Sequence, residues 1–250
     1  MLSVVIVAKN EEDRIERALK SVSDLASEII LVDSGSTDKT VEIAKKYGAK
    51  VFFREWKNYG DQVDYAIKLV SQPWLFVLDA DEEVSPELKK SIQEVIKNPT
   101  ADCYMVNRRT YYLGKFLNYS WYPEWRLRLF KNGKVEYERK VHAKPICKGN
   151  IGKLKGDLYH YSFRNLKEQF DKTIRFAQQS ADLMYSQGKK FHAYNLILNP
   201  IAYFIKFYFI KRGFLDGTRG LIIALSGSMY AFMKYAFLYE KYIKKEKSGK

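Results

Sequence analysis

The chain has 250 residues, of which 46% are hydrophobic, and a formal net charge of +14. This length suits one large domain or a domain with an appendage, and the hydrophobic content excludes a disordered chain. Cys103 and Cys147 match no metal-ligand spacing, so we expect reduced thiols in a cytoplasmic protein. The start, MLSVVIVAKNEE, lacks the basic segment and long apolar run of a signal peptide.

The positive charge is concentrated in the last quarter of the chain. Residues 189–250 carry 12 basic and 3 acidic side chains, a net of +9, whereas residues 1–188 carry 31 and 26. Because motifs that bind DNA or RNA are absent, we expect no nucleic-acid partner. A basic segment with long apolar runs is typical of chains that lie on an anionic membrane surface.

Strands and helices are predicted to alternate over the first hundred residues. Short apolar runs predict strands at 2–8, 28–33, 49–55 and 74–79, and helical spacing predicts helices at 11–27, 36–48, 59–71 and 85–98. Ser36 or Thr37 is expected to cap the second helix and Gly48 to end it, while Ser85 and Pro86 begin the fourth. Four strand–helix units favour a parallel, doubly wound α/β sheet.

The pattern changes from about residue 103. Residues 102–114, 125–138 and 140–146 predict strands of an antiparallel or mixed extension, with KNGK (131–134) as a hairpin turn. Residues 165–187 predict a helix. Two apolar segments follow within 191–239, and the longest uncharged run, Phe191–Ile205, is shorter than the ~20 residues of a membrane span. We therefore expect interfacial or packed helices there.

Acidic and polar side chains follow several of the predicted strands. Asn10 and Glu11, Asp33, and the pair Asp79 and Asp81 all come at strand carboxyl ends, where ligands of such sheets bind. Two carboxylates one residue apart repel each other unless a cation compensates them. The SGST stretch after Asp33 lets backbone N–H groups approach an anion at a helix start. Together these features predict a metal–diphosphate site.

Three motifs carry a resemblance to a known family. VVIVAKNEE, ILVDSGSTDKT and LFVLDADEEVSPEL, in this order, resemble the family 2 nucleotide-sugar glycosyltransferases. The later SWYPEWRLRLF, VHAKP and FLDGTRGL are similar to the lipopolysaccharide core β-glucosyltransferases of that family. The resemblance implies a GT-A fold, which is a Rossmann-like mixed, mainly parallel sheet flanked by helices. We expect a catalytic domain at 1–164, with a nucleotide-binding half at 1–100 and an acceptor half at 101–164, and a helical extension at 165–250.

The resemblance also implies roles for individual residues. The nucleotide pocket would be lined by Ala8, Asn10 and Glu11, and Asp33 would accept a hydrogen bond from uracil. Asp79 would contact the ribose or the diphosphate, and Asp81 would bind Mg²⁺ or Mn²⁺. Further metal ligands would be Glu83 and one histidine, either His160 or His142. Arg126 and Arg128 alternate on a strand, so they share a face and are candidates to clamp the diphosphate.

The general base has three candidates. Glu124 is the first choice, Glu138 the second and Glu136 the third. Relatives often carry an acid directly after the VH pair, where this chain has Ala143, so that acid is not available here.

These features predict an inverting, metal-dependent glycosyltransferase. It would move a hexose, with glucose expected, from a UDP-sugar to a membrane-associated glycan such as lipopolysaccharide core. It would work at the inner face of the cytoplasmic membrane, as a monomer or homo-oligomer. Alternatives are a polyprenyl-phosphate sugar transferase, a nucleotidyltransferase, for which AKNEE lacks the glycine-rich loop, and a basic membrane-binding module with a vestigial nucleotide site. The acids Asp33, Asp79 and Asp81 count against the last.

Overall fold

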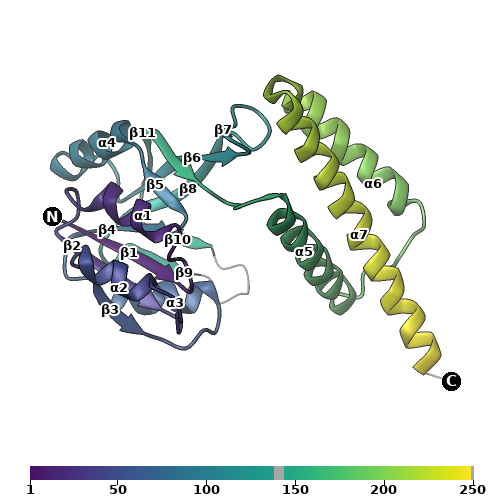
Figure 1. The fold of residues 1–250 in the computed structure, drawn as a ribbon, viewed down its shortest axis with the longest axis horizontal. Helices are drawn as coiled ribbons and strands as arrows, with labels where there is room; N and C mark the ends of the chain where they lie inside the picture. Colours follow the sequence, from purple (N-terminus) through teal and green to yellow (C-terminus); the bar gives the residue numbers. More distant parts are fainter. Residues whose placement is uncertain (138–143, 249–250) are drawn as a thin grey trace. The chain divides into compact units, whose positions relative to one another are not determined.

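The computed structural model describes residues 1–137 and 144–248, and the chain divides into two compact units. The first unit comprises Met1–Arg109 and Pro123–Tyr161, and the second comprises Thr110–Tyr122 and Ser162–Lys250. In Figure 1 the first unit is the α/β body that holds strands β1 to β4, and the second holds the helices coloured green to yellow. The chain thus enters the second unit briefly, returns, and ends there.

One half of the first unit is a parallel sheet. It contains β1 (Leu2–Ala8), β2 (Glu28–Asp33), β3 (Lys50–Phe53) and β4 (Trp74–Asp79), in the order β3-β2-β1-β4. The neighbouring pairs are all parallel. Strands β1 and β2 are almost completely buried, which explains their continuous apolar sequence. The predicted parallel sheet is confirmed.

Four helices alternate with these strands along the chain: α1 (Ile15–Val22), α2 (Thr40–Lys46), α3 (Tyr59–Lys68) and α4 (Pro86–Lys97). Ser85 caps α4 as predicted, because its Oγ accepts the Leu88 N–H at 3.2 Å. Gly48 ends α2 with a φ of +74°. The predicted caps of α2 are wrong, since the helix begins at Thr40. The Ser36 hydroxyl instead donates to Asp33 at the end of β2, and the Thr37 N–H donates to Asn10.

The other half of the first unit is antiparallel or mixed. It contains β5 (Glu82–Val84), β6 (Cys103–Tyr112), β8 (Glu124–Lys131) and β11 (Ile151–His160), and the order continues as β4-β8-β6-β11-β5. Strand β8 pairs antiparallel with both β4 and β6. This arrangement confirms the predicted mixed, mainly parallel α/β sheet and carries β8 next to the carboxyl-end acids of β4.

The predicted hairpin at KNGK is wrong. The turn itself forms, with the Lys134 N–H donating to the Lys131 carbonyl at 3.0 Å. However, β9 (Val135–Tyr137) pairs with β10 (Pro145–Cys147) rather than with β8. Because β4 and β6 already occupy both edges of β8, the strand after the turn has no edge left to pair with.

The expectation of reduced cysteines is also wrong. Cys103, at the start of β6, and Cys147, at the end of β10, form a disulfide across 44 residues of sequence. The lone hairpin β9–β10 lies outside the main sheet, and this covalent bond ties it to the first unit's core at the fully buried Cys103.

The second unit is mainly helical. It contains β7 (Lys115–Phe116), α5 (Leu166–Ser186), α6 (Asn195–Phe204), the π-helix η1 (Ile205–Ile210), the short 3₁₀ helix η2 (Gly213–Asp216) and α7 (Thr218–Ser248). Over residues 218–244, whose side chains the structure describes, helix α7 buries four apolar side chains, Ile223, Ala224, Ala231 and Leu238. In the described part of the chain, the helical segment Thr218–Lys244 is long and apolar enough to cross a membrane. This differs from the prediction, which was based on the length of uncharged runs and expected no membrane span. Core helices of soluble proteins meet the same criterion of length and composition.

Candidate functional site

Two loops at the carboxyl ends of β1 and β2 are tied together by hydrogen bonds. The Asn10 side chain accepts the Thr37 N–H at 2.8 Å, and the Asn10 N–H donates to Ser36 Oγ at 2.9 Å. The Glu11 N–H donates to Thr40 Oγ1 at 2.8 Å. Ala8 lies beside Asp33 in the register of the two strands. The predicted nucleotide-pocket residues therefore form one fixed rim together with Asp33.

Asp33 anchors the turn that follows β2. Its carboxylate accepts the Gly35 N–H at 2.9 Å, the Ser36 N–H at 3.0 Å and the Ser36 hydroxyl at 2.5 Å. Gly35 has a φ of +88°, a conformation that favours glycine, so the chain can fold back over the carboxylate. Two carboxylate oxygens offer about four acceptor positions. Three donors use them here, because the Ser36 N–H is shared between the two oxygens at 3.0 and 3.3 Å, so one more donor would take the place of the longer of these two contacts.

Asp79 is held by side chains from two other elements. Its Oδ1 accepts the Tyr59 hydroxyl of α3 at 2.6 Å, and its Oδ2 lies 2.5 Å from Nη2 of Arg128 on β8. Burial raises the pKa of Asp79, but the Arg128 charge and the Tyr59 hydrogen bond outweigh it and hold the pKa at about 2. Asp79 is therefore ionised and fixed in position.

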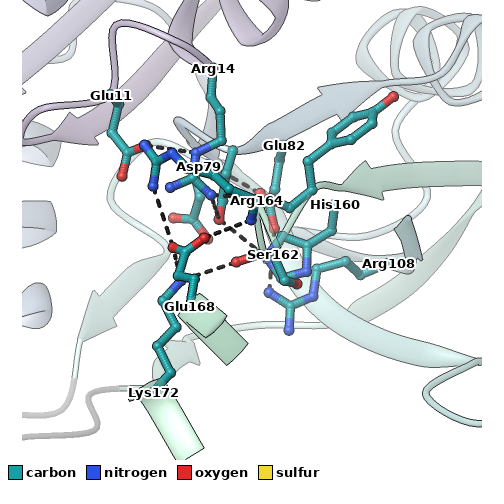
Figure 2. A network of polar contacts seen from close by, with 12 residues as sticks. Glu11, Arg14, Asp79, Glu82, Arg108, His160, Ser162, Arg164, Glu168 and Lys172 are labelled. Carbon is teal, nitrogen blue, oxygen red and sulfur yellow. Dashed lines mark hydrogen bonds and ion pairs between the residues drawn. The ribbon is translucent and has the colours of Figure 1, made fainter. Parts of the chain in front are cut away.

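Glu82 completes this network and was not predicted as a site residue. In Figure 2, Asp79, Glu82 and Arg108 are drawn together, near His160. The Glu82 carboxylate is fully buried and lies 2.6 Å from Arg128 Nη2 and 3.6 Å from Arg108 Nη1. Burial raises its pKa. The alternation of β5, in which Val84 is also buried, is the sequence signal that places Glu82 on the inner face.

The two candidate diphosphate arginines line the same cavity but differ in environment, and the register of β8 with β6 is irregular at Arg128. Arg128 is buried between Asp79 and Glu82, whereas 46% of the Arg126 side chain is exposed and its guanidinium contacts Glu124. A cavity of about 440 Å³ opens here, lined by Tyr59, Asp79, Arg108, Trp125, Arg126, Leu127, Arg128, Tyr137, Lys144 and Pro145. Four cations line this cavity, so its wall is suited to an anion.

Asp81 pairs with His160 and Arg14. His160 Nε2 lies 3.5 Å from Asp81 Oδ2, and Arg14 Nη1 lies 3.7 Å from the same oxygen. Burial raises the pKa of Asp81, but the His160 hydrogen bond and both charges lower it overall. Glu83 is engaged elsewhere, because its carboxylate accepts the Tyr161 hydroxyl at 2.8 Å.

The donor set at Asp81 fits a divalent cation that a substrate shares. Within residues 1–137 and 144–248, no three His, Cys, Asp or Glu side chains converge to form a protein-only metal site. Asp81 and His160 are nonetheless a carboxylate and an imidazole within 3.5 Å of each other. Mg²⁺ is commonly bound by one or two carboxylates and completes its shell with waters and substrate phosphates, and imidazole suits the transition metals.

The candidate bases are placed unequally. Glu124 lies 2.7 Å from Arg108 Nε and 2.5 Å from Arg126 Nη2. Burial raises the pKa of Glu124, but these two arginines lower it overall, so Glu124 is ionised at neutral pH. Glu136 is an exposed residue of β9 that pairs with Lys148. Glu138, His142 and Ala143 lie outside the described residues.

The sequence of the first unit decides the family. Residues 3–152 match the family described as Glycosyl transferase family 2. The chain belongs to this family. It is 32% identical to the lipopolysaccharide core biosynthesis glycosyltransferase LpsC of Rhizobium meliloti (strain 1021), over 96% of this chain and 93% of LpsC. It is 31% identical to the uncharacterized glycosyltransferase RT0209 of Rickettsia typhi, over 97% of this chain and 88% of that protein.

The family's fold is also seen among solved structures. Residues 1–349 of TarS from S. aureus share 14% identity with this chain at a TM-score of 0.51, covering 98% of this chain and 91% of that one. At this identity the similarity concerns the fold alone, and it confirms the GT-A fold implied by the family 2 motifs. The predicted enzyme class, glycosyltransferase, is confirmed by the family.

Proposed function

We propose that this family 2 glycosyltransferase moves a hexose, with glucose expected, from a UDP-sugar to a membrane-associated glycan such as lipopolysaccharide core, with inversion at the sugar. The observation that carries the proposal is the gathering of Asp33, Asp79 and Asp81 at the carboxyl ends of β2 and β4. Asp79 also lines a cavity with four cationic side chains. A nucleoside diphosphate would offer its nucleobase to Asp33 and its negatively charged diphosphate to the cationic side chains of the cavity.

The nucleotide would lie along the rim formed by the β1 and β2 loops. The Asp33 acceptor position that the longer Ser36 contact uses suits the N–H edge of uracil, which adenine lacks in that form. Ala8, Asn10 and Glu11 would line the pocket beside it, because hydrogen bonds already fix their backbone. Asp79, held by Tyr59 and Arg128, would receive hydroxyl groups of the ribose.

Asp81 and His160 would hold Mg²⁺ or Mn²⁺ together with diphosphate oxygens. When bound, the ion would stabilise the negative charge that develops on the departing diphosphate. Glu83 would join these ligands only after leaving the Tyr161 hydroxyl. Arg126, whose side chain is half-exposed on the cavity wall, would contact the diphosphate directly, and the buried Arg128 would act by orienting Asp79.

Glu124 remains the first candidate to take the proton of the acceptor hydroxyl. Its N–H donates to Asn107 Oδ1 at 2.9 Å, so its backbone position is fixed beside the cavity. Its ion pairs with Arg108 and Arg126 keep it deprotonated, as a base must be, but they also weaken its basicity. Glu138 is the second candidate.

The acceptor is proposed from the relative and from the second unit. LpsC is described as a lipopolysaccharide core biosynthesis glycosyltransferase, and the similarity extends over almost the whole of both chains. The net charge of +9 in residues 189–250 supports a place at the inner face of an anionic membrane, where such an acceptor would be presented.

A donor panel tests the proposal. We expect UDP-glucose, among UDP-, GDP- and ADP-sugars, to support transfer to extracted glycolipid, with activity lost in EDTA and restored by Mn²⁺ or Mg²⁺. Asp81→Asn should remove this metal-dependent activity. Asp102→Asn, at an acid paired with Lys131 away from the site, serves as the matched control and should keep it. Equal use of ADP- and UDP-sugars would overturn the donor assignment, and transfer to polyprenyl phosphate alone would overturn the acceptor.

A further inference from the structure

Helix α6 and η1 present an apolar stripe to solvent. Among the described residues neither element has a buried side chain. The exposed members of the stripe are large, and between 45% and 72% of each is accessible: Ile197, Leu198, Ile201, Ile205, Phe209 and Ile210. Their spacing follows one face of a helix, so the exposure is continuous along the element.

The opposite face of α6 packs on α7. Tyr203 lies against Gly227, where the ring leaves no space for a Cβ atom, so glycine permits the close approach of the two helices. The Ser228 hydroxyl of α7 donates to the Pro200 carbonyl at 3.0 Å. These contacts fix the rotation of α6 and leave the apolar stripe on its outer side.

Helix α7, in contrast, is bound into the unit by polar contacts. Gln169 of α5 donates to Ser226 Oγ at 2.9 Å, and both side chains are buried. Ser180 of α5 and Tyr230 lie 2.8 Å apart through their hydroxyl oxygens. If α7 crossed a bilayer alone, these bonds with α5 would break. The structure therefore favours α7 as the scaffold of the unit, although its composition alone would suit a span.

The charge around the stripe indicates what covers it. From Leu183 to Leu215 the sequence has five basic residues and no acidic one. Lys206, Lys211 and Arg212 are exposed on η1 and directly after it. A two-fold contact between copies through this patch would place like charges near one another. An anionic lipid surface instead offers apolar chains for the stripe and phosphate groups for the cations.

We propose that α6 and η1 lie in the plane of an anionic membrane, with the apolar stripe in the lipid and Lys206, Lys211 and Arg212 among the headgroups. The proposal deepens the proposed function, since it names the surface that would bring the enzyme to a membrane-held acceptor. In this arrangement α7 supports the stripe from behind and does not span the bilayer.

Matched charge substitutions test the proposal in the full-length protein. We expect the wild type to sediment with vesicles of phosphatidylglycerol and phosphatidylethanolamine, and to be released by alkaline carbonate. Ile201→Glu or Ile205→Glu should lower the vesicle partition coefficient about tenfold or more, equivalent to roughly 1.4 kcal/mol. Leu183→Glu on α5, at 53% exposure against 52% for Ile201, is the control and should bind as the wild type does.

Each other outcome overturns the proposal in a distinct way. Equal loss in the Ile201 and Leu183 variants would mean that general charge, and not the stripe, decides binding. Resistance of the wild type to carbonate would indicate a spanning helix. A dimer in light scattering that Ile201→Glu dissociates would make the stripe an interface between copies. UDP binding, measured in parallel by calorimetry, separates this test from the proposed function, because the stripe variants should keep it.

Discussion

Glu82→Gln is the substitution that most directly tests the charge network behind the cavity. Glu82 is a fully buried carboxylate that contacts Arg128 at 2.6 Å and Arg108 at 3.6 Å, and it accepts the Asp79 N–H at 3.0 Å. Glutamine keeps the length of the side chain and an oxygen for the Asp79 N–H. It removes one negative charge, so Arg128 retains Asp79 as its only carboxylate partner at that distance in the described chain.

The expected loss of stability follows from two opposing contributions. Removing one partner of a buried ion pair costs about 3–5 kcal/mol, because the remaining charge is left uncompensated. Asp79 still compensates Arg128, and burial raises the pKa of Glu82, so its charge is held at some cost in the native protein. We therefore expect a loss of about 2–3 kcal/mol in the free energy of unfolding, which lowers the urea midpoint by about 1 M for an m-value of roughly 2–3 kcal/mol/M.

The neighbouring acid provides the control. Glu83→Gln makes the same change, from carboxylate to amide, at the next residue. Glu83 points to the other face of β5, its side chain is 31% exposed, and it contacts the Tyr161 hydroxyl. Its loss should be below about 1 kcal/mol. Urea unfolding followed by tryptophan fluorescence measures both variants. Equal midpoints for Glu82→Gln and Glu83→Gln would refute the reasoning that inward orientation decides the cost.

Three further outcomes are expected. Asp33→Ala should erase a preference for UDP over ADP in calorimetry, and an unchanged preference would contradict its role. Burial raises the pKa of Glu28, but hydrogen bonds from Lys50, Ser3 and Ser71 outweigh it and hold the pKa at about 2 instead of 4.5. About 3 kcal/mol of stability that is present above pH 4.5 should therefore disappear as the pH falls toward 2. Unfolding measured against pH should show a weaker dependence in Glu28→Gln. Cys147→Ser should cost about 3–4 kcal/mol in non-reducing buffer and little in dithiothreitol, and equal stability in both would contradict the disulfide.

The parallel half of the fold was predictable because its signals are local. Buried parallel strands are short apolar runs. The helix cap at Ser85 is also local, because its Oγ accepts the N–H of Leu88, only three residues along the chain. The positions of Asp33, Asp79 and Asp81 followed from the same logic, since the end of each apolar run marks the end of a strand. Sequence therefore predicted which acids lie at the carboxyl ends of the strands.

The antiparallel half was less predictable because its partners are distant in sequence. KNGK is a local hairpin signal, but pairing of β8 with β4 and β6 leaves no edge for the strand that follows it. The Cys103–Cys147 bond likewise depends on where β10 lies, and no spacing rule encodes this. Arg128 was predicted to share a strand face with Arg126 and to clamp the diphosphate, but only the approach of β5 and α3 explains why it is buried.

The four acids between the end of β4 and β5 differ in the partners that other elements bring to them. Asp79 and Glu82 share Arg128 from β8, Asp81 contacts His160 from β11 and Arg14 before α1, and Glu83 binds Tyr161. From the sequence alone, the repulsion between these acids was predicted to require a metal ion. In the structure, side chains of the protein already relieve most of that repulsion. We therefore expect a cation at Asp81 to belong to substrate binding and not to folding: a chelator should not unfold this protein, and the ion's affinity should depend on the diphosphate that arrives with it.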